Sequence, residues 1–192
     1  MPRVEIVYFS AMGHTEGIAR SVQRGLETVP GVDAGMLVVS ELGEPGDEAD
    51  PCWARLDAAD AIVLGSPTYM GGVAAEFKGF FDRTGSRWFQ RRWMDKLAAG
   101  FTVGGGLSGD KQSALQAMHV FACQHGMIWV SMGVGVAEPG LDRLSSSIGL
   151  MCQADNAPPA QSPPEEDHAT AQAFGARIGH AAVRWCAGGD GG

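Results

Sequence analysis

The residues best placed to bind a ligand or do chemistry are at positions 10–15, in the order Ser-Ala-Met-Gly-His-Thr. They separate an apolar run that ends at Phe9 from a stretch in which Ile18, Val22 and Leu26 recur every four residues, which is typical of a helix. A strand that leads directly into a helix gathers unpaired backbone N–H groups and the positive end of the helix dipole at one point. Such a point binds anions, and phosphate above all.

This first loop contains neither Lys nor Arg. A phosphate bound there would be held by backbone N–H groups and by the hydroxyls of Ser10 and Thr15. The simpler alternative is a strand-to-helix turn in which a Ser or Thr side chain caps the helix and no ligand binds.

A second loop, Gly-Ser-Pro-Thr-Tyr-Met-Gly-Gly at 65–72, follows the apolar run at 61–65. Pro67 stiffens this loop, and its glycines let the backbone approach a ligand closely. Tyr69 and Met70 supply flat or polarizable surface beside exposed backbone groups, which suits a flat heterocycle with polar edges. The alternative is a turn whose Tyr and Met side chains only cover the core.

A third loop, Gly-Gly-Gly-Leu-Ser-Gly at 104–109, matches the G-x-G-x-x-G pattern of dinucleotide sites. That fingerprint also requires an acidic residue roughly 20 positions later, and the chain has no Asp or Glu between Lys111 and Ala137. The loop also follows the fourth expected strand, where the fingerprint belongs to the first. We therefore interpret it as a glycine loop against the edge of a flat ligand. No glycine loop ends in Gly-Lys-Ser/Thr, which excludes a nucleoside-triphosphate P-loop.

Apolar strand patterns alternate with amphipathic helix patterns along the chain. We expect strands at about 3–9, 33–39, 61–65, 97–103 and 127–130, and helices at about 14–27, 74–84, 110–125 and 165–186. This order predicts an α/β fold with three layers, a doubly wound five-stranded parallel sheet in the order 2-1-3-4-5. The loops at 10–15, 65–72 and 102–109 would then meet in one crevice. We expect a single domain over 1–192, with an irregular insertion at about 135–165 that is too long for a plain connector.

The composition excludes several classes of protein. The net charge is −8 and no basic cluster suits nucleic acid. No apolar run reaches the ~20 residues of a membrane span, and no secretory signal precedes the first strand, so we expect a cytoplasmic protein. Neither the four cysteines nor the five histidines have the spacing of a metal site or a redox dithiol, so no metal is expected.

Two further expectations concern single side chains. Cys123 lies in an apolar helical pattern and is expected to be a buried thiol. The chain's one concentration of positive charge is Arg83, Arg87, Arg91 and Arg92. We interpret it first as a solvated helix end or loop, and second as a patch that attracts an anionic substrate.

A phosphate loop beside two loops suited to a flat heterocycle describes flavin mononucleotide, FMN. The chain resembles the flavodoxin-like superfamily, and most closely its WrbA-type branch of FMN-dependent NAD(P)H:quinone oxidoreductases and NADPH-dependent FMN reductases. The motifs that carry the resemblance are Ser-Ala-Met-Gly-His-Thr at 10–15, Gly-Ser-Pro-Thr at 65–68, Phe-Asp-Arg-Thr-Gly at 81–85 and Gln-His-Gly-Met at 124–127. Residues 136–160 depart from that branch, as does the third loop.

The resemblance implies a role for each loop. The phosphate would be held by Ser10, Met12, Gly13, His14 and Thr15. The isoalloxazine and ribityl chain would be lined by Pro67, Thr68, Tyr69, Met70, Gly71 and Gly72. The pyrimidine side would be met by Thr102, Val103, Gly104, Gly105, Gly106 and Gly109. His125 and Trp88 would wall the pocket in which nicotinamide and quinone stack on the flavin. A neighbouring subunit completes that pocket in the family, which implies a homo-oligomer, either a dimer or a tetramer.

The predicted function is therefore two-electron transfer from NAD(P)H through bound FMN to a quinone-type acceptor. The flavin carries the chemistry, and a neutral His125 would donate a hydrogen bond to the acceptor oxygen. The main alternative is a flavodoxin, which cycles FMN with redox partner proteins and for which an acidic surface is suitable. A third reading is a flavin reductase or redox regulator whose 135–165 segment binds a protein.

Overall fold

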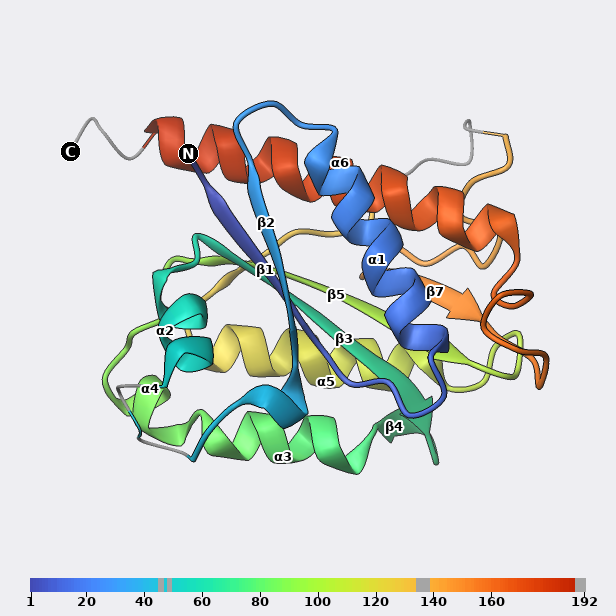
Figure 1. Cartoon of the computed structure of the whole chain (residues 1–192), viewed down its shortest axis with the longest axis horizontal. Coiled ribbons are helices and arrows are strands. Elements are labelled where there is room, and N and C mark those ends of the chain that lie inside the picture. The colour runs from blue at the N-terminus through green and yellow to red at the C-terminus, as the bar shows by residue number, and fades with distance from the viewer. Residues whose placement is uncertain (45–46, 48–49, 134–138, 189–192) are drawn as a thin grey trace.

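The computed structural model describes residues 1–44, 47, 50–133 and 139–188, which form one twisted sheet between two layers of helices (Figure 1). The sheet order is β2-β1-β3-β5-β6, with β4 paired to β3 and β7 paired to β5. The strands are β1 (Arg3–Tyr8), β2 (Asp33–Val38), β3 (Ala61–Tyr69), β4 (Gly72–Val73), β5 (Leu97–Gly104), β6 (Ile128–Trp129) and β7 (Leu150–Gln153). The helices are α1 (His14–Glu27), η1 (Val39–Glu41), α2 (Pro51–Ala58), α3 (Ala75–Arg83), α4 (Gly85–Phe89), α5 (Lys111–Gln124) and α6 (Glu165–Gly188).

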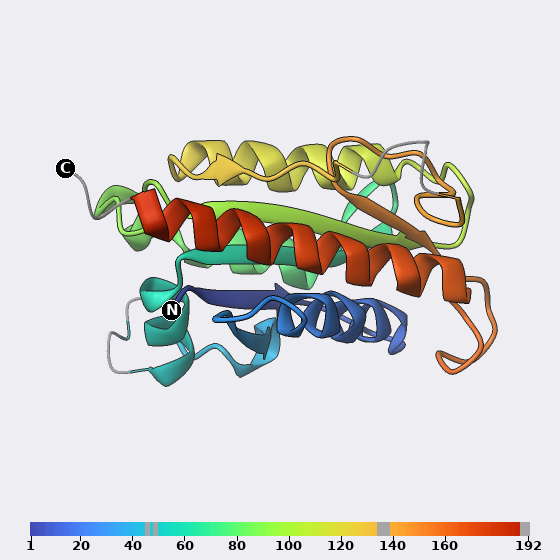
Figure 2. The same ribbon diagram turned by 90° about the horizontal axis from the view of Figure 1, so that it is seen from above.

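Both faces of the sheet are apolar because helices cover both (Figure 2). One core lies between the sheet and the helices α1 and α6, with Ile18, Val22 and Phe174 fully buried. The other core lies under α2, α3 and α5, where Phe77, Phe80 and other aromatic side chains stack. This is the predicted doubly wound α/β architecture, and β1, β2, β3, β5 and β6 pair in parallel as expected.

The fifth position of the sheet differs from the prediction. Two short strands share it: β6 pairs with the start of β5, at Leu97 and Ala98, and β7 pairs with its end, from Phe101 to Gly104. The chain leaves the sheet after β6 and returns to it at β7. A hydrogen bond of 3.1 Å from the Met132 amide to the Ser147 carbonyl joins the two ends of this excursion. Residues 150–153, expected to be irregular, are therefore a core strand; residues 135–138 of that expected insertion lie outside the described residues.

Candidate functional site

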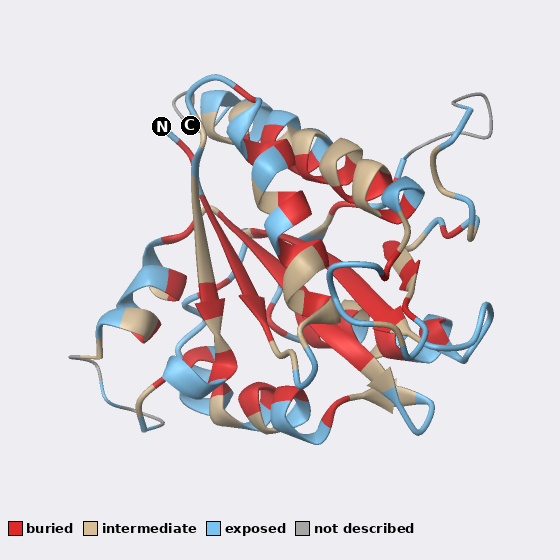
Figure 3. Cartoon of the chain, turned by 45° about the vertical axis from the view of Figure 1, so that its right-hand side comes forward, coloured by how far each residue is buried: buried red, intermediate tan, exposed pale blue. Residues whose placement is uncertain are grey.

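The three predicted loops meet at the carboxyl edge of the sheet, which comes forward in Figure 3. They enclose a cleft of about 330 Å³. Its lining residues are Ser10, Ala11, Met12, His14, Thr15, Pro67, Thr68, Tyr69, Val103, Gly104 and Gly105, together with Ala154, Asp155 and Asn156. Ten of these were predicted from the sequence, and their convergence follows from the parallel pairing of β1, β3 and β5.

The first loop forms an anion site at the start of α1. Gly13 is the N-cap, with φ of 89°, and as a glycine it has no side chain with which to cap the helix. Among the described residues, the amide groups of Met12, His14 and Thr15 make no hydrogen bond. These donors, the helix dipole and the absence of any cation fit a phosphate held by neutral groups.

Ser10 shapes this loop from within. Its Oγ accepts hydrogen bonds from the amides of Gly13 at 3.1 Å and Glu16 at 3.2 Å. The oxygen therefore satisfies two of the amides that a helix start leaves open. The hydroxyl proton remains as the group that Ser10 can offer to a ligand.

The second loop is a β-hairpin that extends β3 beyond its predicted end. Thr68 pairs with Val73 and Tyr69 with Gly72, so that Met70 and Gly71 form a two-residue turn. Both turn residues have positive φ, 48° and 78°, as a type I′ hairpin requires. Tyr69 lines the cleft, whereas Met70, Gly71 and Gly72 do not, and the Met70 side chain is fully exposed at the turn.

Threonine hydroxyl groups join the strand that leads into the third loop to the neighbouring strand. Thr102 is fully buried and donates through Oγ1 to the Ser66 carbonyl at 2.8 Å. The Thr68 hydroxyl must then donate to Thr102 Oγ1, 2.7 Å away, because Thr102 has only one proton. Thr102 thus fixes two neighbouring strands and does not line the cleft, nor do Gly106 and Gly109.

A fourth segment, which the sequence analysis missed, closes the cleft. Residues 154–156 follow β7, and the Ala157 carbonyl lies 2.8 Å from His14 Nε2. Asp155 lines the cleft, and the pKa of its carboxyl is lowered, first by the Ala157 amide that donates to it at 2.9 Å. Assigning residues 150–153 to a strand would have placed this segment at the same edge as the other loops, but a run of four residues is too short to show a strand pattern.

His125 and Trp88 do not reach the cleft of their own chain. They line a separate cavity of about 530 Å³ with Phe81, Thr84 and Val120. His125 precedes β6, which pairs with the first residue of β5, whereas the third loop follows the last residue. An eight-residue strand spans roughly 25 Å, so His125 and the third loop lie at opposite ends of the strands.

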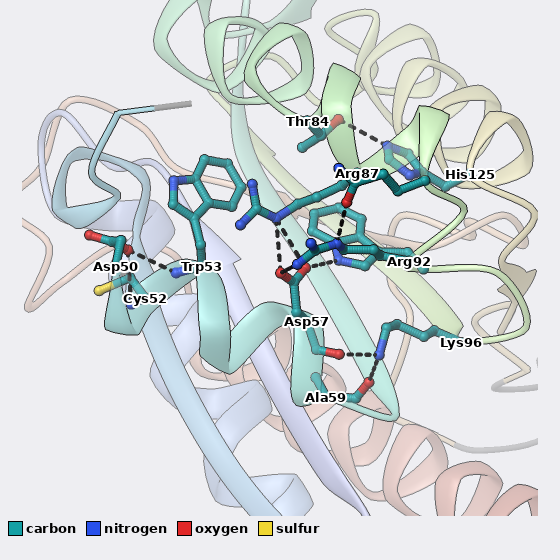
Figure 4. Close-up of polar contacts among 12 residues, drawn as sticks. Asp50, Cys52, Trp53, Asp57, Ala59, Thr84, Arg87, Arg92, Lys96 and His125 are labelled. Atoms are coloured by element: carbon teal, nitrogen blue, oxygen red, sulfur yellow. Dashed lines mark hydrogen bonds and ion pairs between the residues drawn. The ribbon is translucent and has the colours of Figure 1, made fainter. Parts of the chain in front are cut away.

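The hydrogen bonds around His125 define its tautomer (Figure 4). The Thr84 hydroxyl donates its proton to the Phe81 carbonyl at 2.7 Å, so its oxygen accepts from His125 Nε2 at 2.9 Å. Nδ1 is buried and has no partner among the described residues, and desolvation lowers the pKa of His125 to about 4. The ring is neutral at pH 7, as predicted, but it has no free N–H with which to donate to an acceptor oxygen.

The four clustered arginines differ in exposure: Arg91 and Arg92 are exposed, as expected of a solvated helix end, Arg83 is half-buried and Arg87 is buried. Arg87 is 3% exposed, and its Nε donates to the Asp57 carboxylate at 3.0 and 3.2 Å. Asp57 also accepts from Trp93 Nε1 at 2.8 Å, and the Arg87 guanidinium lies over the Trp53 ring. The interpretation of these arginines as solvated was wrong for Arg87, because the helical pattern does not reveal the carboxylate on α2 that it pairs with. Cys123, expected to be buried, is exposed, with Sγ 3.6 Å from His119 Nε2.

The fold and the cleft define a class: a doubly wound sheet with an anion-binding helix start and two flanking loops is a flavodoxin-like, FMN-dependent oxidoreductase. The sequence model of the NADPH-dependent FMN reductase family matches residues 10–139, so the chain belongs to this family. Flavodoxin FldP of Pseudomonas aeruginosa is 38% identical over 184 residues, 93% of this chain and 95% of that protein. These matches confirm the family assignment made from the motifs.

Two further comparisons agree. The NAD(P)H dehydrogenase (quinone) of Chromohalobacter salexigens is 32% identical over 78% of this chain and 79% of its own length. The crystal structure of a flavodoxin, WrbA-like protein from Agrobacterium tumefaciens is similar with a TM-score of 0.74 and 35% identity, covering 96% of this chain and 99% of that one. The fold and branch predicted from the sequence are thereby confirmed.

Two kinds of feature are absent from the described residues. No helix among them is both long and apolar enough to cross a bilayer. Within the same part of the chain, no group of three or more His, Cys, Asp or Glu side chains is placed to hold a metal ion.

Proposed function

We propose that the cleft at the carboxyl edge holds FMN, with the phosphate at the start of α1 and the flavin between the second and third loops. The observation that carries this proposal is the group of unpaired amides at Met12, His14 and Thr15, which faces a cleft walled by Thr68, Tyr69 and the glycine loop. Asp155 would accept hydrogen bonds from ribityl hydroxyls, because its carboxylate is ionised at neutral pH.

The proposed reaction is transfer of two electrons from NAD(P)H to a quinone-type acceptor. The bound FMN supplies the redox chemistry. The chain's own residues hold the phosphate, fix the ring against Tyr69 and the third loop, and exclude water from one side of the flavin. Relatives named NAD(P)H dehydrogenase (quinone) support this acceptor class.

The test is turnover by the purified, FMN-loaded protein. We expect a flavin absorbance spectrum and oxidation of NADH or NADPH in the presence of benzoquinone, at a rate well above that of the same concentration of free FMN. Turnover no faster than free FMN with both nucleotides would contradict the proposal.

A second candidate function is that of a flavodoxin, which the similarity to flavodoxin FldP favours. A flavodoxin receives electrons from a reductase protein. If the anaerobic protein stays oxidised with NADH and NADPH but is reduced through a reductase, this second function is supported and the first is not.

We also propose that the face around Trp88 and His125 completes the cleft of another copy of this chain, in a dimer or tetramer. Trp88 is 47% exposed and Phe89 82% exposed, beside the 530 Å³ cavity. The second loop in turn presents exposed Tyr69 and Met70, at and beside the cleft, to its surroundings. Apolar surface on both sides favours association of the two faces.

Mixed oligomers test this arrangement. We expect a Gly13→Val chain, with its phosphate loop disrupted, and a Trp88→Ala chain each to be weakly active alone. Co-expressed with two different tags and purified as the mixed species, they should recover activity, because the intact cleft of one meets the intact Trp88 of the other. A mixed oligomer no more active than the average of its parents would contradict composite sites.

A further inference from the structure

Lys111, the first residue of α5, is fully buried beneath the third loop. Lysine is almost never fully buried unless it is paired, yet none of the described carboxylates forms an ion pair with this ammonium. Its Nζ instead donates to the carbonyl oxygens of Gly106 and Leu107, the latter at 3.3 Å. The sequence analysis gave this residue no role, and neither does the proposed site.

These two hydrogen bonds set the direction of the loop's peptide groups. In a planar trans peptide, the C=O and the following N–H point in opposite directions. With the carbonyls of Gly106 and Leu107 turned inward to Lys111, the amides of Leu107 and Ser108 point away from it. Within the described residues, the amides of Gly105, Gly106, Leu107 and Ser108 make no hydrogen bond. Gly105 lines the cleft, whereas Leu107 and Ser108 line a neighbouring cavity, so Lys111 fixes the loop whose first residues form the cleft wall.

The lysine also lies directly behind the wall of the cleft. A Cβ built on Gly104 would stand 3.4 Å from Lys111 Cε, and Gly104 lines the cleft. The pKa of Lys111 is lowered, first by burial and also by the charge of Arg143, against the opposing effect of Cys152 and Asp167. The Asp167 carboxylate already forms an ion pair with Arg143, whose Nε lies 2.6 Å from Oδ1. Its negative charge is therefore not available to Lys111 alone. A charge in such a low-dielectric position acts over longer distances than a solvated one.

We infer that Lys111 is a positioning residue for the flavin. It holds the third loop in place and puts a positive charge behind the cleft wall at Gly104, so that the chain binds reduced FMN more tightly than oxidised FMN. The reason is charge: two-electron reduction of a flavin leaves it anionic near neutral pH, whereas the oxidised ring is neutral. The inference rests on the proposed placement of FMN in this cleft.

The test separates hydrogen bonding from charge with two variants of the full-length holoprotein. K111Q keeps amide donors for the two carbonyls and removes the charge, whereas K111M removes both. The measurements are the Kd of oxidised FMN by calorimetry and the midpoint potential of the bound flavin. We expect K111Q to change the Kd of oxidised FMN less than threefold and to weaken the binding of reduced FMN about tenfold. The tenfold loss lowers the two-electron midpoint potential by about 30 mV. K111M should show the same shift together with weaker oxidised binding.

Two controls make the outcome decisive. R24M removes an exposed cation in the last turn of α1 and should leave both quantities unchanged. K111R keeps the charge and should restore the potential. A potential that does not move in K111Q would overturn the role of Lys111, whereas undiminished FMN binding in Gly13→Val would instead overturn the placement of FMN in the cleft. If K111M does not fold, K111Q alone decides the question.

Discussion

Replacing Gly13 with valine is expected to weaken FMN binding by about 10- to 100-fold. Gly13 has φ of 89°, in the left-handed region, where a residue with a β-carbon loses roughly 1–3 kcal/mol. A Cβ there would also lie 2.9 Å from Pro159 Cγ and would displace the segment that contacts His14. Each 1.4 kcal/mol lost corresponds to a tenfold change in Kd. Titration of the apoprotein with FMN, by calorimetry, measures the effect.

Gly31 offers a matched control. Its φ is 80°, so Gly31→Val carries a similar backbone strain, but a Cβ there would meet nothing within 4 Å. Gly31 stands in the turn between α1 and β2, at the edge of the sheet remote from the cleft. Gly31→Val should lower thermal stability and leave the Kd of FMN unchanged. Equal loss of FMN affinity in both variants would show that general destabilisation, and not the phosphate loop, is responsible.

Substituting alanine for Asp57 is expected to reduce the free energy of unfolding by about 3–5 kcal/mol, the usual cost of breaking a buried ion pair by removing one partner. The Arg87 side chain is 3% exposed and that of Asp57 17%, so the guanidinium would be left without its carboxylate inside the protein. Trp93 Nε1 would lose its acceptor as well. For a chain of this size, the midpoint of thermal unfolding should fall by roughly 10 °C, as measured by circular dichroism.

The exposed pair Lys78–Asp82 provides the comparison. Both of its side chains are more than half exposed, and Asp82→Ala should cost less than about 1 kcal/mol. Combining Asp57→Ala with Arg87→Met should cost less than the sum of the single changes, because the unpaired cation is removed. Additive losses would show that the two groups do not stabilise each other.

Periodicity was sufficient for most of the architecture. The recurrence of Ile18, Val22 and Leu26 marks α1, whose predicted range of 14–27 agrees with the structure. The run at 61–65 reads as a strand buried on both faces, and β3 begins there. Once the strand order is known, the three loops must share one edge. The glycine, serine and threonine content of those loops then indicates the candidate cleft without further information.

The remaining features depend on partners distant in sequence. β7 has four residues, Leu-Met-Cys-Gln, and takes its strand form from pairing with β5 about fifty positions earlier. No local pattern reveals that pairing. The segment at 154–156, which β7 brings to the cleft, could therefore not be predicted from the sequence. The tautomer of His125 and the ion pair of Arg87 depend in the same way on Thr84 and Asp57, whose positions only the folded chain determines.

The interrupted fifth strand also bears on how this fold can diverge. The hydrogen bond between Met132 and Ser147 joins the two ends of the loop that connects β6 and β7. Both of these strands pair with β5, which therefore sets their register in the sheet. The entropic cost of closing a longer loop rises only slowly, by about 0.6 kcal/mol for each doubling of its length. The number of residues between these two points can therefore vary at little entropic cost, provided that Arg143 still pairs with the buried Asp167. Proteins that share this scaffold have room here to acquire new surface while the cleft is retained.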